Sequence, residues 1–588
     1  MAADQTTIFN RFQGTSLKYP KNIALGWKIE GKYQTINYSQ LLDKVNRCVS
    51  GLRKLNIKVG TKVAIFSSNR PEWAILDLAL NKIGAISVPI HTTLSPNLIK
   101  HILEDSKAEY LALGEFLSKY QEIENQISLK KVISFNYIDW RADFVYFQNF
   151  FKEQPDIQEA AVKDYCTIIY TSGTTGKPKG VMLTDDNFIQ NIDAALKYVP
   201  YYPADSLLSF LPLSHVLERT GGYYCPLFCG AAVYFAESSK TIAEDIKKVK
   251  PTILISVPRI FEKVYEKVLE NIKSKNSIKQ KIFFSSLKLA RYYLNTHKTG
   301  SALKFFLKAG YYLADSLVLS KGRVALGGRL RFSISGGAPL SASVARFFES
   351  LGIVILEGYG LTETSPIISV NPITDYRFGT VGKIIPGVEV KIADDKEILT
   401  KGHNIMKGYF NNEAATNESF ISLGLSGEAE SEARWFKTGD LGFLDNENYL
   451  TIIGRKKEMI VTATGKNVNP EELENALIQS KYIAQAMVYG DKEKYISALL
   501  VPDFMELKKY AEINNIQLEL FELLNYQPIL ELFKNEAVNY LSHFSDNEKV
   551  KNFVLADREF SEEKEELTPT LKLRRKKILD NFNRLFKK

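Results

Sequence analysis

The sequence contains few of the residues that bind metals or form disulfide frameworks. Its 588 residues include four cysteines and six histidines. Four cysteines are too few for a disulfide-rich scaffold, which indicates a reducing compartment. Only Cys225 and Cys229 lie close together, and no histidine is near enough to complete a zinc site. We therefore expect no dedicated protein metal cage.

Long apolar runs are also missing. The longest uncharged run of note, residues 220–236, falls short of the roughly 20 apolar residues that a membrane span needs, and it contains Pro226 and several glycines. We interpret it as buried core. Residues 1–14 lack the basic start and apolar segment of a secretory signal. These observations predict a cytoplasmic protein, with association at the inner face of a membrane as an open alternative.

The overall composition is that of a globular protein. Hydrophobic residues make up 45% of the chain and charged residues 24%. This balance excludes intrinsic disorder, collagen and coiled coil as overall classes. At roughly 100–200 residues per domain, the length predicts several domains or one large multi-lobed domain.

The net charge of +9 is unevenly distributed. Residues 259–323 contain 14 basic and 4 acidic residues, and residues 571–588 contain 8 basic and 1 acidic residue. The remainder of the chain then carries a net charge of −8. The protein is therefore a slightly acidic body with two basic segments.

The first basic segment, 259–323, is predicted to be a helical insertion. Apolar residues recur there every four positions, at Ile260, Val264, Val268 and Ile272. The plainest interpretation is a packed helical face with solvated lysines. A basic, aromatic-rich surface that contacts anionic lipid is an alternative, and an acidic carrier protein is another partner of suitable charge. No recognition motif supports nucleic-acid binding.

Short β-rich runs alternate with helical stretches through most of the chain, as in the strand 62–66, the helix opened by Pro71 and the strand 85–90. This alternation predicts an α/β fold with layered subdomains and mainly parallel sheets. The residue pattern changes after Gly454, where a charged stretch, a glycine loop and a predicted helix at 471–478 follow. We place the domain boundary there, between residues 1–454 and residues 455–588.

The strongest local motif follows a predicted strand at 167–170 and reads Thr171-Ser172-Gly173-Thr174-Thr175-Gly176-Lys177-Pro178-Lys179-Gly180. Its glycines allow tight turns and close approach of a ligand to the backbone. Its hydroxyls, N–H groups and lysines suit a polyphosphate. The spacing is not that of a Walker A loop, because only two residues separate Gly173 from Gly176 and a proline follows the lysine. An ordinary flexible loop is the alternative.

Three weaker signals carry groups that could contact a nucleotide. The run 358–364 (Gly-Tyr-Gly-Leu-Thr-Glu-Thr) follows a predicted strand and offers a ring to stack on a base and a carboxylate for Mg²⁺. The run 335–339 also follows a strand, and its small residues allow a flat ring to approach the backbone. Asp440 follows a glycine and is either a turn residue or a partner for ribose hydroxyls. Taken alone, His215 and the charge runs around 455–458 and 568–572 are typical of ordinary structural and solvated positions.

Together, in this order and spacing, these motifs resemble those of the AMP-forming acyl-CoA synthetases, also called adenylate-forming enzymes. The likeness extends from about Phe9 to Lys572 and is greatest to bacterial long-chain fatty acid–CoA ligases. Three positions depart from the common pattern: Lys437, His403 and Gly454. None of them removes a catalytic group that the resemblance implies.

The resemblance implies a role for each motif in binding ATP and Mg²⁺. The 171–180 loop would wrap the β- and γ-phosphates, with Thr171, Ser172, Gly173, Thr174, Thr175, Gly176 and Lys177 as its ATP-binding residues. Thr171 and Glu363 would hold Mg²⁺. Adenine would lie against Gly336, Ala338 and Tyr359, with Gly358 and Gly360 beside the tyrosine. Thr362 would contact the α-phosphate, and Asp440 the ribose, with Arg455 nearby.

The resemblance also implies a mobile α+β C-terminal domain. Lys457 matches the hinge, Lys572 the catalytic lysine that bridges ATP and the carboxylate, and Gly465 the loop that shapes the channel for the coenzyme A thiol. In the large domain, His215 matches a residue near the acyl carboxylate. Tyr223 and Gly337 are candidates for the acyl pocket.

The implied activity is ATP-dependent ligation of a long-chain fatty acid to coenzyme A through an acyl-AMP. Thr362, Glu363, His215 and Lys572 would be the catalytic residues. An acyl-acyl-carrier-protein synthetase or a fatty acyl-AMP ligase is an alternative. A non-catalytic nucleotide- or lipid-binding scaffold is a third hypothesis, which the presence of Lys572, Glu363 and Asp440 disfavours.

Overall fold

The chain forms two compact units. The computed structural model describes residues 6–171, 177–238, 240–295, 303–422, 434–463, 465–546, 548–568 and 572–586. Unit 1 comprises Met1–Lys391, Leu399–Thr438 and Leu444–Thr451, and unit 2 comprises Ile392–Ile398, Gly439–Phe443 and Ile452–Lys588. The division between residues 454 and 455 that the sequence suggests stays a prediction.

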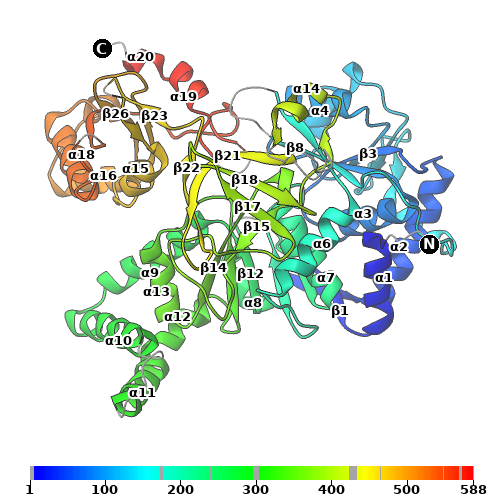
Figure 1. Cartoon of the computed structure of the whole chain (residues 1–588), viewed down its shortest axis with the longest axis horizontal. Helices are drawn as coiled ribbons and strands as arrows, with labels where there is room; N and C mark the ends of the chain where they lie inside the picture. The colour runs from blue at the N-terminus through cyan, green and yellow to red at the C-terminus, as the bar shows by residue number, and fades with distance from the viewer. Residues whose placement is uncertain are drawn as a thin grey trace. The chain divides into compact units, whose positions relative to one another are not determined.

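Two large sheets dominate unit 1 (Figure 1). The first has nine strands in the order β16-β15-β14-β13-β12-β10-β11-β1-β2. Their bounds are β1 Ile23–Ile29, β2 Lys32–Asn37, β10 Ser206–Ser209, β11 Ala232–Phe235, β12 Ile253–Ser256, β13 Phe332–Ser335, β14 Val354–Gly360, β15 Ile367–Val370 and β16 Lys383–Ile384. All pairs from β1 through β11, β10, β12 and β13 to β14 are parallel, and the outer pairs are antiparallel.

The second sheet has eight strands in the order β19-β9-β8-β4-β3-β5-β6-β7. Their bounds are β3 Lys62–Phe66, β4 Ile86–Pro89, β5 Tyr110–Leu113, β6 Lys131–Ser134, β7 Val145–Tyr146, β8 Thr167–Thr171, β9 Lys179–Leu183 and β19 Gly408–Tyr409. The strands from β8 to β7 are parallel, whereas β9 and β19 add to the edge in antiparallel fashion. A further five-stranded sheet joins β17 Val388–Ile392, β18 Glu397–Gly402, β20 Phe420–Ser422, β21 Arg434–Leu444 and β22 Leu450–Arg455.

Helices separate the parallel strands, as a crossover connection requires. Those of the body of unit 1 are α1 Ile8–Lys18, α2 Tyr38–Lys54, α3 Pro71–Ile83, α4 Pro96–Ser106, α5 Leu117–Gln121, α6 Asp185–Leu196, α7 Cys225–Cys229, α8 Ile242–Val249, α13 Ala342–Ser350 and α14 Glu413–Glu418. Short turns of 3₁₀ or π type are η1 Glu124–Gln126, η2 Phe147–Lys152, η3 Glu218–Tyr224 and η6 Thr362–Thr364. Pro71 occupies the first turn of α3, where its missing N–H costs nothing.

The predicted insertion is helical. It consists of α9 Pro258–Lys273, α10 Ser277–Asn295, α11 Leu303–Ala314, the π-type turn η5 Asp315–Leu319 and α12 Ser320–Ala325. Phe283, Leu287 and Ala290 of α10 are buried in one apolar cluster with Phe348 of α13. Figure 1 shows α10 and α11 extending from α9 and α13 away from the sheets of unit 1.

Unit 2 is a small α+β structure. Its three-stranded sheet has the order β25-β26-β27, and a separate hairpin pairs β23 with β24. The elements are β23 Ile460–Val461, β24 Asn467–Val468, α15 Pro470–Leu477, β25 Ile483–Tyr489, β26 Ile496–Pro502, α16 Phe504–Ile513, α17 Leu520–Leu523, α18 Gln527–Tyr540, β27 Val550–Leu555, α19 Arg575–Asn581 and α20 Asn583–Phe586. The predicted α/β class, with mainly parallel sheets and a small α+β C-terminal region, is confirmed.

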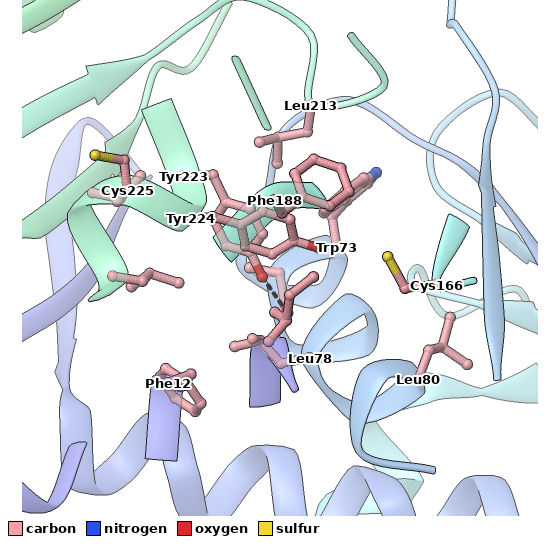
Figure 2. Close-up of a cluster of buried hydrophobic side chains, with 14 of the residues drawn as sticks. Phe12, Trp73, Leu78, Leu80, Cys166, Phe188, Leu213, Tyr223, Tyr224 and Cys225 are labelled. Atoms are coloured by element: carbon pink, nitrogen blue, oxygen red, sulfur yellow. Dashed lines mark hydrogen bonds between the residues drawn. The ribbon is translucent and has the colours of Figure 1, made fainter. Parts of the chain in front are cut away.

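The core of unit 1 encloses a buried ion pair between Asp77 of α3 and Arg219 of η3. Both side chains are inaccessible to solvent. Arg219 also donates to the hydroxyls of Ser87 and Thr167, each at 2.8 Å, and the Tyr224 hydroxyl donates to Asp77 at 2.6 Å. Figure 2 labels Trp73, Phe188 and Tyr224 in the buried cluster, and the Arg219 guanidinium lies 5.4–5.8 Å from the centres of these three rings. The network ties η3 to the strands β4 and β8.

The segment 220–236 is buried in unit 1, as its composition predicts. It contributes most of η3, then α7 and β11, and Tyr223 and Tyr224 are wholly buried. Among the described residues, no helix is long and apolar enough to cross a membrane.

Replacing Asp77 with alanine leaves Arg219 buried without its counter-charge. We expect this change to lower the free energy of unfolding of unit 1 by about 3–5 kcal/mol, measured by urea denaturation. The matched control is Arg11→Ala, which breaks the exposed pair of Arg11 with Asp193 and should cost about 0–1 kcal/mol. Similar losses in both variants would contradict the central role of the buried pair.

Candidate active site

The carboxyl ends of β13 and β14 bring two of the predicted motifs together. These strands are parallel neighbours, with Ser335 in register with Glu357. The run 336–338 follows the first strand, and Gly358, Tyr359 and Gly360 complete the second. Both motifs therefore lie at one edge of the nine-stranded sheet, where ligand crevices of α/β proteins occur.

Two glycines at this edge are required by the backbone. A Cβ atom on Gly360 would lie 1.6 Å from the carbonyl oxygen of Pro366, so no other residue fits there. Gly337 has φ of +87°, in the left-handed region that favours glycine. The glycines thus shape the surface on which Ala338 and Tyr359 lie.

The turn that follows β14 connects to the edge of the other sheet. The Tyr409 hydroxyl, on β19, donates to Oε1 of Glu363 at 2.9 Å, and the Met406 N–H donates to the Glu363 carbonyl oxygen. Lys179 of β9 places its ammonium 5.0 Å from the centre of the Tyr409 ring. Lys179 is in register with Thr171, the last residue of β8. A continuous set of contacts therefore runs from Thr171 through Lys179 and Tyr409 to Glu363.

The groups in this set suit a metal-bound polyphosphate. Among the described residues, the Tyr409 bond is the sole hydrogen bond of the Glu363 side chain, so oxygen sites of the carboxylate remain available. No group of three or more His, Cys, Asp or Glu side chains that could hold a metal ion occurs in the described part of the chain. A single available carboxylate such as Glu363 fits Mg²⁺, which is usually held by one or two carboxylates together with substrate phosphates. Ser172, Gly173, Thr174, Thr175 and Gly176 lie outside the described residues, and Lys177 is exposed.

Glu357 is a further residue of this edge, and the sequence analysis did not single it out. Its Oε2 accepts from the Leu340 N–H at 3.0 Å, which holds the loop after β13 against β14. Burial raises the pKa of Glu357 to about 7, opposed by the backbone N–H donors of Leu340 and Gly379. In the sequence, Glu357 is a single charged residue within an apolar strand, and that signal could have identified it. The sequence could not have identified Leu340 as its hydrogen-bond partner.

His215 lies in the loop before η3 and has His91 as a neighbour. The His215 Nδ1 accepts from the Leu217 N–H at 3.3 Å. Burial, together with the charges of His215 and Lys119, lowers the pKa of His91 to about 3. His91 is therefore neutral at physiological pH. The Leu217 side chain reaches within 3.2 Å of the Cβ position of Gly336, so this loop lies beside the glycine edge.

The turn η3 carries one predicted pocket residue and one unexpected carboxyl group. Tyr223 is buried, and its hydroxyl donates to the Ala74 carbonyl oxygen at 3.0 Å. Glu218 is 1% exposed, and neither of its carboxylate oxygens has a hydrogen-bond partner among the described residues. Burial raises the pKa of Glu218 to about 8, and the nearby Ser209 hydroxyl opposes the shift. A role of Tyr223 and Gly337 in an acyl pocket stays a prediction.

Unit 2 carries the remaining predicted residues. Arg455 Nε lies 3.0 Å from Oδ1 of Asp440, and Asp440 is buried. Glu397 accepts from the Gly439 N–H at 3.0 Å and pairs with Lys456 at 2.7 Å, which fixes the backbone next to Asp440. The sequence did not indicate this contribution of Glu397.

The backbone of Lys572 is held by two hydrogen bonds to Thr568. The Thr568 N–H donates to the Lys572 carbonyl oxygen at 2.8 Å, and the Lys572 N–H donates to the Thr568 hydroxyl at 3.0 Å. The charges of Asp440 and Arg455 are among those that influence the pKa of the Lys572 ammonium. Lys457 is exposed between β22 and β23. Gly465 has φ of +76° in the turn of the β23–β24 hairpin.

Comparison with known proteins places this arrangement in a family. The model of the AMP-binding enzyme family matches residues 12–410, and that of the AMP-binding enzyme C-terminal domain matches residues 457–531. The chain is 35% identical over 566 residues to the long-chain-fatty-acid–CoA ligase FadD15 of Mycobacterium bovis, covering 94% of this chain and 92% of that protein. The chain belongs to the AMP-binding enzyme family.

Two further proteins illustrate the range of the similarity. The human long-chain-fatty-acid–CoA ligase ACSBG1 is 30% identical, with 98% of this chain and 84% of that protein covered. The adenylation domain of a carboxylate reductase from Mycobacterium chelonae superposes with a TM-score of 0.78 at 21% identity, covering 100% of this chain and 91% of that one. The second similarity concerns the fold alone.

Glu218 predicts a pH dependence of stability. An unfolded glutamate loses its proton near pH 4.5, whereas the buried one does so near pH 8. Between these values, rising pH favours the unfolded chain by up to about 1.4 kcal/mol per pH unit. Glu218→Gln removes this penalty, so its Tm should exceed that of the wild type by more at pH 8 than at pH 5. The exposed control Glu531→Gln should track the wild type at both pH values, and a Glu218→Gln difference independent of pH would refute the buried neutral acid.

Proposed function

We propose that the protein ligates a long-chain fatty acid to coenzyme A, using ATP and releasing AMP and pyrophosphate. The observation that carries this proposal is the connection between Thr171 at the end of β8 and Glu363 in the turn after β14, through Lys179 and Tyr409 of the edge strands β9 and β19. The similarity to long-chain-fatty-acid–CoA ligases of two distant organisms supports the substrate class.

The chemistry requires activation of the fatty acid. A carboxylate is a poor electrophile because expelling oxide from it is too costly. Attack of the carboxylate oxygen on the α-phosphorus of ATP forms an acyl-AMP mixed anhydride and expels pyrophosphate. The thiol of coenzyme A then attacks the acyl carbon, and AMP leaves with its bonding electron pair.

The main obstacle in the first step is repulsion between an anionic carboxylate and an anionic triphosphate. Fixed positive charges and backbone donors lower this barrier most when they are already in position. We assign phosphate binding to the loop from Thr171 to Lys177. Thr171 and Glu363 would hold Mg²⁺, which supplies positive charge next to the phosphates when it is bound. Thr362 would contact the α-phosphate.

The adenine of ATP would use the glycine edge, and its ribose is assigned to Asp440. Adenine would lie on the surface formed by Gly336, Ala338 and Tyr359, since the glycines leave space for a flat ring. Asp440, oriented by Arg455, would accept from the ribose hydroxyls. His215 is assigned to the fatty acid carboxylate.

Unit 2 supplies the groups that separate the two half-reactions. Lys572 would neutralise charge between ATP and the carboxylate in the first step. Coenzyme A needs the same region free for its thiol in the second step. We assign the backbone change between these steps to Lys457 and the thiol channel to the turn at Gly465, since hinge residues at element ends absorb such changes.

A carrier-protein thiol is the competing acceptor, because the basic segment 259–323 would suit an acidic protein. A pyrophosphate-release assay decides between the acceptors. It uses carboxylates from acetate to oleate, each with coenzyme A, holo-acyl carrier protein or no acceptor. We expect release to be greatest with long-chain acids and to continue over many turnovers only with coenzyme A. Sustained turnover with holo-acyl carrier protein alone, or a single turnover without any thioester, would replace the proposal with the corresponding alternative.

Two lysine variants provide matched controls for this assay. Lys572→Ala should abolish most acid-dependent pyrophosphate release, whereas Lys576→Ala, a change at an exposed lysine of α19, should leave it intact. Absence of release with every acid in the wild type would favour a non-catalytic scaffold.

A further inference from the structure

The helical insertion has an outer apolar surface that nothing in the described protein covers. Along α10, the residues Phe283, Leu287 and Ala290 face the core. A second apolar line on the same helix, Ile278, Ile282 and Tyr292, is 66%, 50% and 52% exposed. A surface helix with one core face normally has polar residues elsewhere, so this second line needs a separate explanation.

The exposed apolar residues continue on the neighbouring helical segments. Helices α10 and α11 pack closely, because the Cβ position of Gly310 lies 3.3 Å from Leu289 and the rings of Tyr293 and Tyr311 stack with centroids 4.7 Å apart. We define the insertion surface as the large, mostly exposed apolar residues of α10–α12: Ile278, Ile282, Tyr292, Tyr312, Leu313, Leu317 and Val324. Single exposed apolar residues are ordinary. Seven of them on α10, α11 and the segments η5 and α12 that follow are unusual.

The charge along α10 and α11 is of one sign. Residues 277–314 contain seven lysines and arginines and no aspartate or glutamate. Lys281 and Lys288 of α10 are exposed and seven residues apart, so they form a line on the helix beside Ile278 and Ile282. The single acidic residue of the following segment, Asp315, is paired with Arg323 at 2.5 Å. No carboxylate therefore offsets these two lysines within residues 277–314.

We propose that the insertion surface docks the protein on an anionic lipid bilayer. Aliphatic and aromatic side chains flanked by lysines are the composition of helices that lie in the membrane interface. Each basic residue near an anionic surface adds attraction that falls within a Debye length. An acidic protein fits less well, because lysine is depleted in protein–protein interfaces. This inference concerns a surface outside the nucleotide site and does not depend on the proposed reaction.

Vesicle co-sedimentation of the full chain tests the proposal. The probes are vesicles of phosphatidylglycerol mixed with phosphatidylcholine, and vesicles of phosphatidylcholine alone. We expect binding to the anionic vesicles and little binding to the neutral ones. Binding to the anionic vesicles should weaken at about 0.5 M salt, because salt shortens the Debye length and screens the lysines. Failure of the wild-type chain to prefer anionic vesicles overturns the proposal without any variant.

Paired variants locate the surface. Ile282→Gln with Leu313→Gln removes apolar contacts, and Lys281→Gln with Lys288→Gln removes charge. Each pair should lower the partition coefficient by about tenfold or more. The matched controls are Ile157→Gln, at a 96% exposed residue, and Lys21→Gln with Lys32→Gln, which lie outside the insertion.

The outcomes separate lipid from protein docking. Loss of vesicle binding in both insertion pairs, with the controls unchanged and thermal melts by circular dichroism like the wild type, supports the proposal. Unchanged vesicle binding in the insertion pairs, or equal loss in the controls, overturns it. Binding of immobilised holo-acyl carrier protein without vesicle binding also overturns it and assigns the surface to an acidic protein.

Discussion

The link between strand ends of two sheets is the constraint on which the proposed triphosphate site of unit 1 depends. Parallel strands end at a common edge, so motifs far apart in the chain can meet there. The hydrogen bond from Tyr409 to Glu363 links the edge of one sheet to the edge of the other. Lys179 and Thr171 extend that link to the predicted phosphate loop. The glycines at 337 and 360 leave space that a side chain would otherwise occupy.

The rest of unit 1 keeps this edge in place. The buried pair of Asp77 and Arg219 connects α3 and η3 to β4 and β8, and β8 ends at Thr171. Glu357 ties the loop that contains Ala338 to β14. A buried ion pair is weak support for stability by itself, but its hydrogen bonds here join four elements that position the site. The helical insertion lies outside this framework, which leaves its outer surface available for docking.

Local patterns were enough to predict the elements and the motifs. β3 runs over Lys62–Phe66 and α3 begins at Pro71, as periodicity and proline placement indicate. The contacts that assemble the site were not predictable, because they join distant residues: 46 positions separate Tyr409 from Glu363, and 142 separate Arg219 from Asp77. The buried carboxyl of Glu218, which has no hydrogen-bond partner among the described residues, was also hidden, since its burial depends on the packing of η3 against neighbouring strands. The family resemblance, not residue spacing, indicated the roles of Asp440 and Lys572.

Binding of ATP to Glu363→Gln in the presence and absence of Mg²⁺ is the most direct test of the central claim. Equilibrium dialysis or calorimetry measures the affinity without any acid or thiol present. The account predicts that Mg²⁺ strengthens ATP binding to the wild type, and that the variant loses at least about tenfold of the affinity measured with Mg²⁺ while matching the wild type when Mg²⁺ is chelated. Equal affinity of the two proteins for ATP with Mg²⁺ would contradict the placement of the metal and triphosphate at this edge.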